Sequence, residues 1–288
     1  MKARHQRPRK VVHPQSPFLC HMPAVRTTVY GVSLVEHTPR AGVIWSGATQ
    51  VRARPWPNIP GRAFLLISGS HGPSIRLPDS PVLATWLTTL SSWGYSSVRT
   101  SALAPAAATA FADIGFTVAQ ELSLLERQHS SHPPVSAPDT YAISRVRISP
   151  ISRSIKKSVL ADILAVDHAS FGEQWAMDEQ TMREALSATR RVRLFVWKSD
   201  DRIEGFVLVG ATGRQGFVQR LAVHPVAQRN GIATQLLEAS LAWTHRHGCT
   251  ATVVNTEVSN SAALGAYHRF GFAPLDYGLS VLEMQIPQ

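Results

Sequence analysis

The segment VHPVAQRNGIATQLLEASLAW, Val223–Trp243, joins the end of an apolar strand to a long amphipathic helix through a short polar turn. Ile232, Leu236, Leu237 and Ser240 recur at helical spacing, so we expect this face to seat the helix on a sheet. An α-helix begins with four backbone N–H groups that lack partners within the helix, and with a partial positive charge. The segment therefore predicts a helix whose first turn is open to an anionic group.

The residues of the turn are small or basic where a ligand would approach. Gly231 and Ala233 carry little or no side chain, and Arg229 adds a mobile positive charge, which suits a diphosphate held by backbone amides. Two other phosphate motifs do not fit, because no Lys-Ser or Lys-Thr follows Gly231 and the turn lacks G-x-G-x-x-G. The predicted phosphate-binding residues are Gln228, Arg229, Asn230, Gly231, Ile232, Ala233 and Thr234.

Around this turn, strand and helix patterns alternate. Period-two or continuous apolar runs predict strands over residues 144–151, 191–200, 202–212, 217–225, 250–258 and 279–286. Helical spacing predicts helices over residues 159–171, 178–188 and 260–271. This order indicates an α/β (α+β) fold, with a mixed, twisted sheet flanked by helices.

Length and composition set wider bounds. A chain of 288 residues is long enough for two domains with separate cores. No apolar run reaches the length of a membrane span, and no signal-peptide pattern follows Met1, so we expect a soluble, cytoplasmic protein. Cys20 and Cys249 are the only two cysteines, which excludes a disulfide framework and gives no metal-ligand spacing.

The net charge of +10 is concentrated near the N-terminus. Residues 1–144 carry thirteen Lys and Arg against six Asp and Glu, and the opening MKARHQRPRK holds five basic residues and no acidic one. We interpret this opening as part of a solvated, disordered tail over residues 1–22. A weak, salt-sensitive contact with RNA or another polyanion is the alternative.

The two halves of the chain also echo each other. Gly94–Glu126 and Gly248–Glu283 share the order strand, small-residue helix, Gly-Phe and LSxLE. Phe111 in the first copy corresponds to Tyr267 in the second, and Ala104 corresponds to Asn260. The first copy thus lacks the polar side chains of the second, and we predict that it is degenerate.

Together these motifs resemble the GNAT N-acetyltransferase superfamily over roughly residues 144–288. Gln228, Gly231 and Ala233 match its Q/R-x-x-G-x-G/A signature, and Asn260, Ala263 and Tyr267 match its downstream motif. The tandem arrangement is distantly similar to mycothiol synthase relatives. The implied division is a basic tail (1–22), a shortened, degenerate GNAT-like domain (23–127), a linker (128–143) and a catalytic GNAT domain (144–288).

The resemblance implies acetyl-CoA as co-substrate and a primary amine as acceptor, attacked directly. Backbone groups of Leu221, Ala222 and Val223 would bond the pantetheine arm in the gap between two diverging strands, and Val223 N–H would face the thioester oxygen. Tyr267 would protonate the departing thiolate. Asn260 would cap its helix and also reach the cofactor.

The remaining assignments are less specific. Glu257 is the favoured general base, acting through water, although an edge carboxylate in solvent explains it nearly as well. We expect His224 to be a turn residue and Cys249 a small buried thiol. Trp175, Met177 and Tyr277 either line the acceptor pocket or belong to the core. The sequence does not predict the acceptor or the oligomeric state. The alternative functions are a non-catalytic acyl-CoA sensor and a basic RNA- or ribosome-associated protein. We expect no membrane partner.

Overall fold

The structure is a computed structural model that describes residues 40–46, 49–67, 77, 79–132, 134–136, 138 and 142–287. These residues belong to one compact unit that spans residues 37–288. The predicted basic tail over residues 1–22, and Cys20 within it, lie outside the described residues. Within the described part of the chain, no helix is both long enough and apolar enough to cross a membrane.

The first half forms β1 (Gly42–Ser46), β2 (Thr49–Pro55), β3 (Arg62–Leu66), α1 (Ser80–Ser92), β4 (Ser97–Thr100), α2 (Pro105–Ala112) and β5 (Thr117–Gln128). The second half begins with β6 (Ile143–Arg145), α3 (Lys157–Phe171), α4 (Glu179–Ser187), β7 (Arg191–Ser199) and β8 (Arg202–Thr212). It ends with β9 (Gln215–Val223), the 3-10 turn η1 (Pro225–Ala227), α5 (Ile232–Arg246), β10 (Ala251–Glu257), α6 (Ser261–Arg269), β11 (Ala273–Pro274) and β12 (Leu279–Gln285).

These elements confirm the predicted α/β fold and the helices and strands expected from the sequence. One strand is shorter than predicted, because β6 ends at Arg145 whereas alternation suggested a strand to Ile151. The chain instead turns where Arg153 N donates to Ser149 O at 3.1 Å, with Arg153 in the left-handed region. Pro150 lies within this turn and has no N–H to donate to a strand partner.

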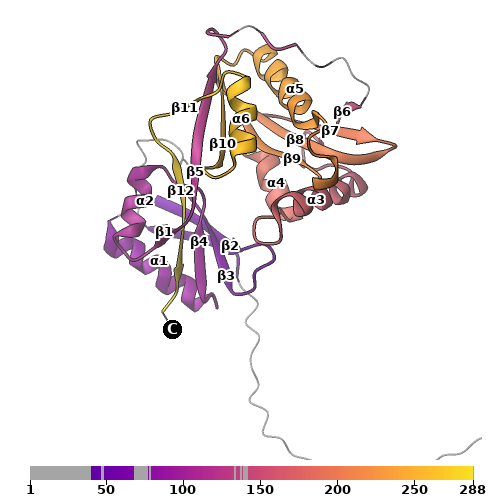
Figure 1. Cartoon of the computed structure of the whole chain (residues 1–288). Coiled ribbons are helices and arrows are strands. Elements are labelled where there is room, and N and C mark those ends of the chain that lie inside the picture. Colours follow the sequence, from indigo (N-terminus) through magenta and orange to yellow (C-terminus); the bar gives the residue numbers. More distant parts are fainter. Residues whose placement is uncertain are drawn as a thin grey trace, which may run out of the picture. The chain divides into compact units, whose positions relative to one another are not determined.

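The described strands form one mixed sheet in the order β1-β2-β3-β4-β12-β5-β10-β9-β8-β7-β6, and β11 pairs with β5 beside it. Figure 1 shows β5 and β12 side by side between the two groups of strands. The last strand of the second half therefore pairs with β4 of the first, and the last strand of the first half pairs with β10 of the second. The two halves have exchanged their final strands.

The strand pairing confirms the internal repeat that the sequence predicted. The antiparallel, antiparallel, parallel pairings of β1, β2, β3 and β4 repeat in β7, β8, β9 and β10. The two LSxLE segments meet at their first residues, since Leu122 pairs with Leu279 in an antiparallel register and the segments then run in opposite directions. An approximate two-fold relation between the copies passes through this pair.

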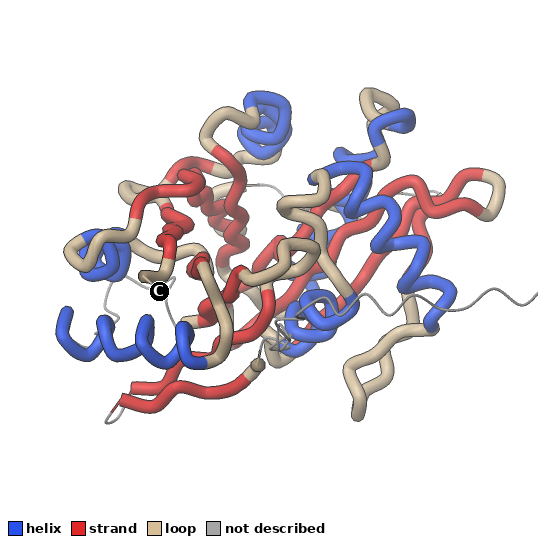
Figure 2. The backbone as a smooth tube through the Cα atoms, turned by 90° about the horizontal axis from the view of Figure 1, so that it is seen from below, coloured by secondary structure: helices blue, strands red, loops and turns tan. Residues whose placement is uncertain are grey.

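Helices cover both faces of the sheet, as Figure 2 shows. In the second half, α5 and α6 pack on one face over Val207, Val209 and Val218. On the opposite face, α3 and α4 pack over Leu194, Phe206 and Leu208. A separate core lies in the first half, where α1 and α2 pack around Trp86 and Phe111.

The domain boundaries remain a prediction. The strand β5 runs to Gln128 and β6 begins at Ile143, so the linker predicted for residues 128–143 falls between these strands apart from its two end residues. Because β5 and β12 each pair with strands of the other half, the backbone is shared across this boundary.

Candidate active site

The adjacent strands β9 and β10 diverge at the centre of the second half. Their parallel pairing begins at Gln215 and Ala251 and ends at Val218 and Val254. Beyond that point β9 continues to Val223 against β8, whereas β10 continues against β5. The predicted gap between these strands is therefore present, and it opens toward the start of α5.

Backbone groups of β9 face this gap in alternation. His224 N donates to Glu204 O at 2.8 Å, so the backbone groups of His224 point toward β8. Successive residues of a strand point their N–H and C=O groups to opposite sides, so those of Ala222 also face β8 while those of Leu221 and Val223 face the gap. Of the three residues predicted to bond a ligand here, Leu221 directs both backbone groups to the gap and Ala222 is committed to the sheet. Val223 offers its N–H alone, because its carbonyl accepts from Gln228 and Ser170.

The turn after β9 leaves the N-terminus of α5 uncapped. Gly231 is the N-cap residue, has φ +76°, and makes no side-chain cap. A Cβ at Gly231 would meet no atom within 4 Å, so the space in front of the helix is open. The first-turn N–H groups of Ile232, Ala233 and Thr234 thus have no side-chain acceptor, as the sequence predicted for an anion site.

Side chains of the turn bind their own backbone and hold this opening in shape. Gln228 Nε2 donates to Val223 O at 3.1 Å and ties the turn to the end of β9. Asn230 Nδ2 donates to Ala227 O at 3.3 Å. Arg229 lies in the left-handed region with φ +65°, and its side chain is exposed.

Tyr267 of α6 is 5% exposed and belongs to the same buried core cluster as Val223, Ala227 and Ile232. Its ring contacts Phe272 edge to face, with centroids 5.7 Å apart. Burial raises the pKa of Tyr267 to about 12, which keeps its phenol protonated at neutral pH.

The other predicted catalytic side chains lie at the end of β10. Glu257 is exposed and shares a face of the strand with Asn255, which is also exposed. Both follow the last residue that pairs with β9. Asn260 caps α6 as predicted, since its side chain accepts from Ala263 N at 3.1 Å.

Residues 160–272 match the acetyltransferase (GNAT) family. The second half of this chain contains a GNAT domain. Over 83 residues it is 36% identical to N-alpha-acetyltransferase 30 of Schizosaccharomyces pombe, which covers 27% of this chain and 55% of that protein. Over 184 residues it is 28% identical to mycothiol acetyltransferase of Nocardia farcinica, which covers 59% of this chain and 58% of that protein. Each match spans little more than half of the relative.

Solved structures extend the likeness in fold to both halves. A tandem GNAT protein from the clavulanic acid biosynthesis pathway has a TM-score of 0.58 at 14% identity, over 85% of this chain and 82% of that one. A GCN5-related N-acetyltransferase from Kribbella flavida has a TM-score of 0.51 at 11% identity, over 86% and 90%. These likenesses confirm the GNAT fold and its tandem arrangement.

In its described residues, the first copy of the GNAT fold lacks the extended strand end of the second. Its equivalent of β9 is β3, which ends at Leu66, one residue beyond the Leu65–Thr100 pair with β4. The helix that corresponds to α6 is α2, whose N-cap is Ala104 and which makes no side-chain cap. Phe111 fills the place of Tyr267 and is 1% exposed. The described part of this copy therefore offers neither the diverging strand nor the phenol.

A buried ion pair lies beside the diverging strands, and it was not predicted from the sequence. Arg220 of β9 binds Asp167 of α3 through two bonds of 2.7 and 2.9 Å, and Asp167 is fully buried. Ser170 Oγ, one turn further along α3, donates to Val223 O at 3.1 Å. The helix VLADILAVDHASF holds two acids, and only Asp167 follows the apolar spacing of Ile163 and Val166 into the core, which was the signal available in the sequence because a buried carboxylate needs a partner.

Gln219 was also not predicted. It sits at the register shift of β9 against β8, directly after the last residue that pairs with β10. Its Oε1 is buried and has no hydrogen-bond donor. A buried acceptor without a partner is costly unless a ligand or water supplies the donor, so this atom fits a site that binds N–H groups.

The remaining candidates divide between core and site. Cys249 is buried, and burial raises the pKa of its thiol, which agrees with the predicted structural role. His224 Nδ1 accepts from Val226 N at 3.4 Å, as a turn residue does. Met177 packs on the core under α3, and Tyr277 packs beside Val253. Trp175 stacks on Arg99 of the first half.

Proposed function

We propose that this chain is an acetyl-CoA-dependent N-acetyltransferase that acetylates a primary amine where β9 and β10 diverge. The observation that carries the proposal is the last part of β9, which no longer pairs with β10 and which leads through a short turn to the uncapped first turn of α5. The GNAT domain and the two acetyltransferase relatives support this chemistry.

The residues present fit acetyl-CoA, which would supply the acetyl group. The open space at Gly231 and the free N–H groups from Ile232 to Thr234 would hold its diphosphate, with the exposed Arg229 beside them. Leu221 would bond an amide of the pantetheine arm through its gap-facing backbone groups, and Val223 would offer only its N–H, because its carbonyl already accepts from Gln228 and Ser170. Asn260 already caps α6, so any contact it makes with the cofactor is additional.

The chain would then contribute three groups to acetyl transfer. The acceptor amine attacks the thioester carbonyl, and Val223 N–H stabilises the negative charge that develops on the carbonyl oxygen. The C–S bond breaks as the C–N bond forms, and Tyr267 donates its proton to the departing sulfur. Glu257 takes the proton lost by the amine, through a water molecule. Positioning of the two reactants supplies much of the remaining rate acceleration.

The acceptor class is the open part of this proposal. One relative is named as an N-alpha-acetyltransferase and another as a mycothiol acetyltransferase, so both a peptide α-amine and a small-molecule amine merit testing. We would incubate the protein with acetyl-CoA and one of four amines, namely tetra-alanine, cysteine amide, spermidine or kanamycin, and measure the release of CoA thiol. At least one amine should be acetylated at a rate well above its own blank.

Cofactor binding is tested by Gly231→Glu. We expect this change to abolish stabilisation by acetyl-CoA in a thermal-shift assay, because it places bulk and negative charge in the diphosphate position. Gly248→Glu is the matched control, since Gly248 has φ +75° and an equally open Cβ position at the other end of α5. The control should lose a similar amount of stability and still respond to acetyl-CoA. If wild-type protein responds to RNA but not to acetyl-CoA, the proposal is wrong.

A further inference from the structure

We propose that the first half of the chain positions the segment between α3 and α4, Gly172–Asp178, and that Trp56, Asn58 and Arg99 are the positioning residues. The assignment of this segment to the acceptor side of the site rests on the proposed function. The contacts between the first half and the segment are independent of that function.

The turn between β2 and β3 binds the backbone of this segment directly. Trp56 Nε1 donates to Gln174 O at 3.0 Å, and Asn58 Nδ2 donates to Glu173 O at 3.3 Å. Asn58 has φ +61°, a backbone conformation that asparagine tolerates better than most residues. Two consecutive carbonyls of the segment therefore take donors from the first half.

Arg99 of β4 lies against two indole rings that come from different halves and that contact each other edge to face, with centroids 5.6 Å apart. Its guanidinium carbon lies 4.9 Å from the Trp56 ring centroid and 4.6 Å from that of Trp175. Arg99 is 2% exposed, and its Nε donates to Glu283 of β12 at 3.1 Å. In the amide orientation that satisfies both side chains, Gln174 accepts from Arg99 at 2.9 and 3.0 Å. Cations stack favourably on aromatic faces, so this arrangement fixes Trp175.

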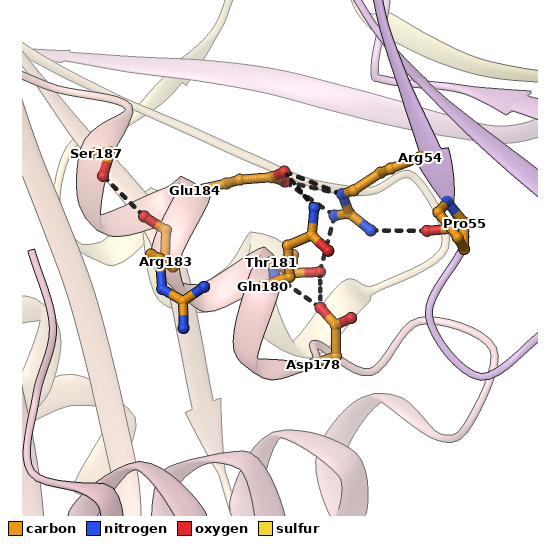
Figure 3. Close-up of polar contacts among 8 residues, drawn as sticks. All are labelled: Arg54, Pro55, Asp178, Gln180, Thr181, Arg183, Glu184 and Ser187. Carbon is orange, nitrogen blue, oxygen red and sulfur yellow. Dashed lines mark hydrogen bonds and ion pairs between the residues drawn. The ribbon is translucent and has the colours of Figure 1, made fainter. Parts of the chain in front are cut away.

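A second contact holds the start of α4, as Figure 3 shows. Arg54 of β2 binds both carboxylate oxygens of Glu184 at 2.9 to 3.1 Å and donates to Thr181 Oγ1 at 3.0 Å. Thr181 in turn donates its backbone N–H to the N-cap residue Asp178 at 2.7 Å. Arg54 is 2% exposed, so this pair is shielded from solvent. The two ends of the segment are thus held by the same half of the molecule.

The segment has a turn of its own, because Trp175 N and Ala176 N both donate to Gly172 O at 3.2 and 2.9 Å. It begins at Gly172, which has φ +70° and an open Cβ position, and Glu173 and Gln174 are exposed. On its other side it contacts β9, because Arg220 donates to Trp175 O at 2.9 Å, and α3, because Met177 N donates to Asp167 at 2.7 Å. Arg220 is three residues before Val223, whose amide faces the gap. A path of direct contacts therefore runs from Trp56 to the active site.

The segment lies on the face of the sheet opposite α5, where α3 and α4 pack. If the diphosphate occupies the start of α5, the amine has to arrive at the diverging strands from the other face. The segment is then part of the acceptor wall, and the degenerate half has a role in acceptor binding although its own site is lost.

The test uses two changes that remove donors and retain shape. Trp56→Phe deletes the Nε1–H and keeps a ring against Arg99, and Asn58→Gly deletes the side-chain donor at a φ that glycine adopts freely. Trp45→Phe is the matched control, because Trp45 is 67% exposed on the same half and makes no contact with the segment among those described. All variants are made in the full chain.

Hydrogen exchange over residues 172–178 is the first measurement. We expect the double variant Trp56→Phe/Asn58→Gly to exchange about three- to tenfold faster there than wild type, the range for losing one or two hydrogen bonds. Exchange in α5 should be unchanged, and Trp45→Phe should match wild type throughout. Unchanged exchange over residues 172–178 in the double variant overturns the inference. Should that variant fold poorly, Asn58→Gly alone answers the same question, because Asn58 is exposed.

Kinetics provide the second measurement, with tetra-alanine, cysteine amide, spermidine and kanamycin as acceptors. The KM for the amine should rise about three- to tenfold in the double variant, while the KM for acetyl-CoA stays within about twofold of wild type. A merely structural role would raise both constants, or neither, and would contradict the inference. If wild type acetylates none of the four amines, the proposed function fails, whereas the exchange result still decides whether the first half positions the segment.

Discussion

The helices α2 and α6 correspond to each other in the two copies, and at one matched position their side chains differ by a single oxygen. Tyr267 and Phe111 both occupy the seventh position of their helices and both are buried, so each packs as an aromatic core residue. Packing therefore explains the ring at both places but not the hydroxyl. The copy that retains the hydroxyl is also the copy in which the first of the two parallel strands extends well beyond its parallel pairing, which supports a chemical role for Tyr267.

Replacing that hydroxyl should separate catalysis from binding. We expect Tyr267→Phe to lower kcat by about 10²- to 10⁴-fold, the usual contribution of a general acid, and to leave acetyl-CoA binding within about threefold of wild type. Tyr95→Phe is the comparison, because Tyr95 is also buried and its hydroxyl donates to Arg40 O at 2.7 Å. That change should cost about 1 kcal/mol of stability without slowing turnover. Equal turnover in Tyr267→Phe and wild type would rule out the acid.

His129 predicts how stability depends on pH. It is buried, and its pKa is lowered to about 4 by burial and by the charges of Arg127, His245 and His132. His129 Nε2 also lies 2.9 Å from Thr252 Oγ1. An unfolded histidine binds a proton near pH 6.5, which the folded protein resists until about pH 4. The contribution of His129 to stability is therefore complete above about pH 6.5 and is lost as the pH falls toward 4.

The measurement is the melting temperature of wild type and of His129→Gln between pH 4 and pH 8. The gap between the two curves should narrow as the pH falls through this window, because the variant lacks the group whose protonation opposes folding. His168→Gln changes an exposed histidine and should run parallel to wild type. Parallel curves for His129→Gln would mean that His129 is already protonated in the folded protein, or that its burial is not maintained.

At the scale of single residues, features that depend on neighbours in the sequence could be predicted, whereas contacts between residues far apart in the sequence could not. The cap at Asn260 and the open Gly231 follow from residues within one turn of themselves. The contact between Trp56 and Gln174 joins residues 118 positions apart, and no local pattern reports it. Leu221, Ala222 and Val223 show a third case, because which backbone groups face the gap depends on the register with β8.

Among the elements, α5 is placed by the strand beneath it. A Cβ on Gly205 of β8 would lie 2.9 Å from Ile232 Cγ2 and 3.2 Å from Leu236 Cδ1, so the first turn of α5 approaches the sheet more closely than any side chain permits. Ile232 carries one of the N–H groups of the proposed phosphate site, and Leu236 lies one turn later in the same helix. The glycine in the predicted strand RIEGFVLVGAT therefore sets the position of the ligand-binding turn.

Adding a methyl group at this position should displace the turn. We expect Gly205→Ala to lower both the melting temperature and the affinity for acetyl-CoA, because the shift moves the amides that bind the diphosphate. Gly265→Ala should raise the melting temperature, since a Cβ there lies in an α-helix and would meet only Arg269 Nη1, at 3.9 Å. That change should stabilise the protein by about 0.5–1 kcal/mol. Thermal shift and calorimetric titration with acetyl-CoA measure both effects, and an unaltered affinity in Gly205→Ala would show that the turn tolerates the displacement.

Strands illustrate a limit of prediction at the level of elements. The alternation in LSVLEMQI correctly predicted a strand, now β12, but alternation specifies which residues face the core and not which strand lies alongside. The neighbours of β12 are β4 and β5 of the first half. This pairing depends on the shared strand arrangement of the two copies, because either final strand fits the edge that the other copy presents.

For the whole molecule, the exchanged strands should make unfolding a single event. Each half contributes the strand that completes the sheet of the other, so neither can lose its core and leave the other half with all its hydrogen bonds. Scanning calorimetry should therefore show one transition whose calorimetric and van 't Hoff enthalpies agree. Separate domains over residues 23–127 and 144–288, as the composition suggested, would instead allow two transitions.

Two core substitutions distinguish these possibilities. Leu65 in the first half and Leu208 in the second are both almost fully buried, and replacing either leucine with alanine should cost about 2–5 kcal/mol. If the halves unfold together, Leu65→Ala and Leu208→Ala each lower the temperature of the one transition, and the protein keeps its enthalpy in a single peak. If the halves unfold separately, each variant splits off a low-temperature peak that contains only its own half. The second result would mean that β5 and β12 add little cooperativity, and that the first half can loosen without releasing the segment at Gly172–Asp178.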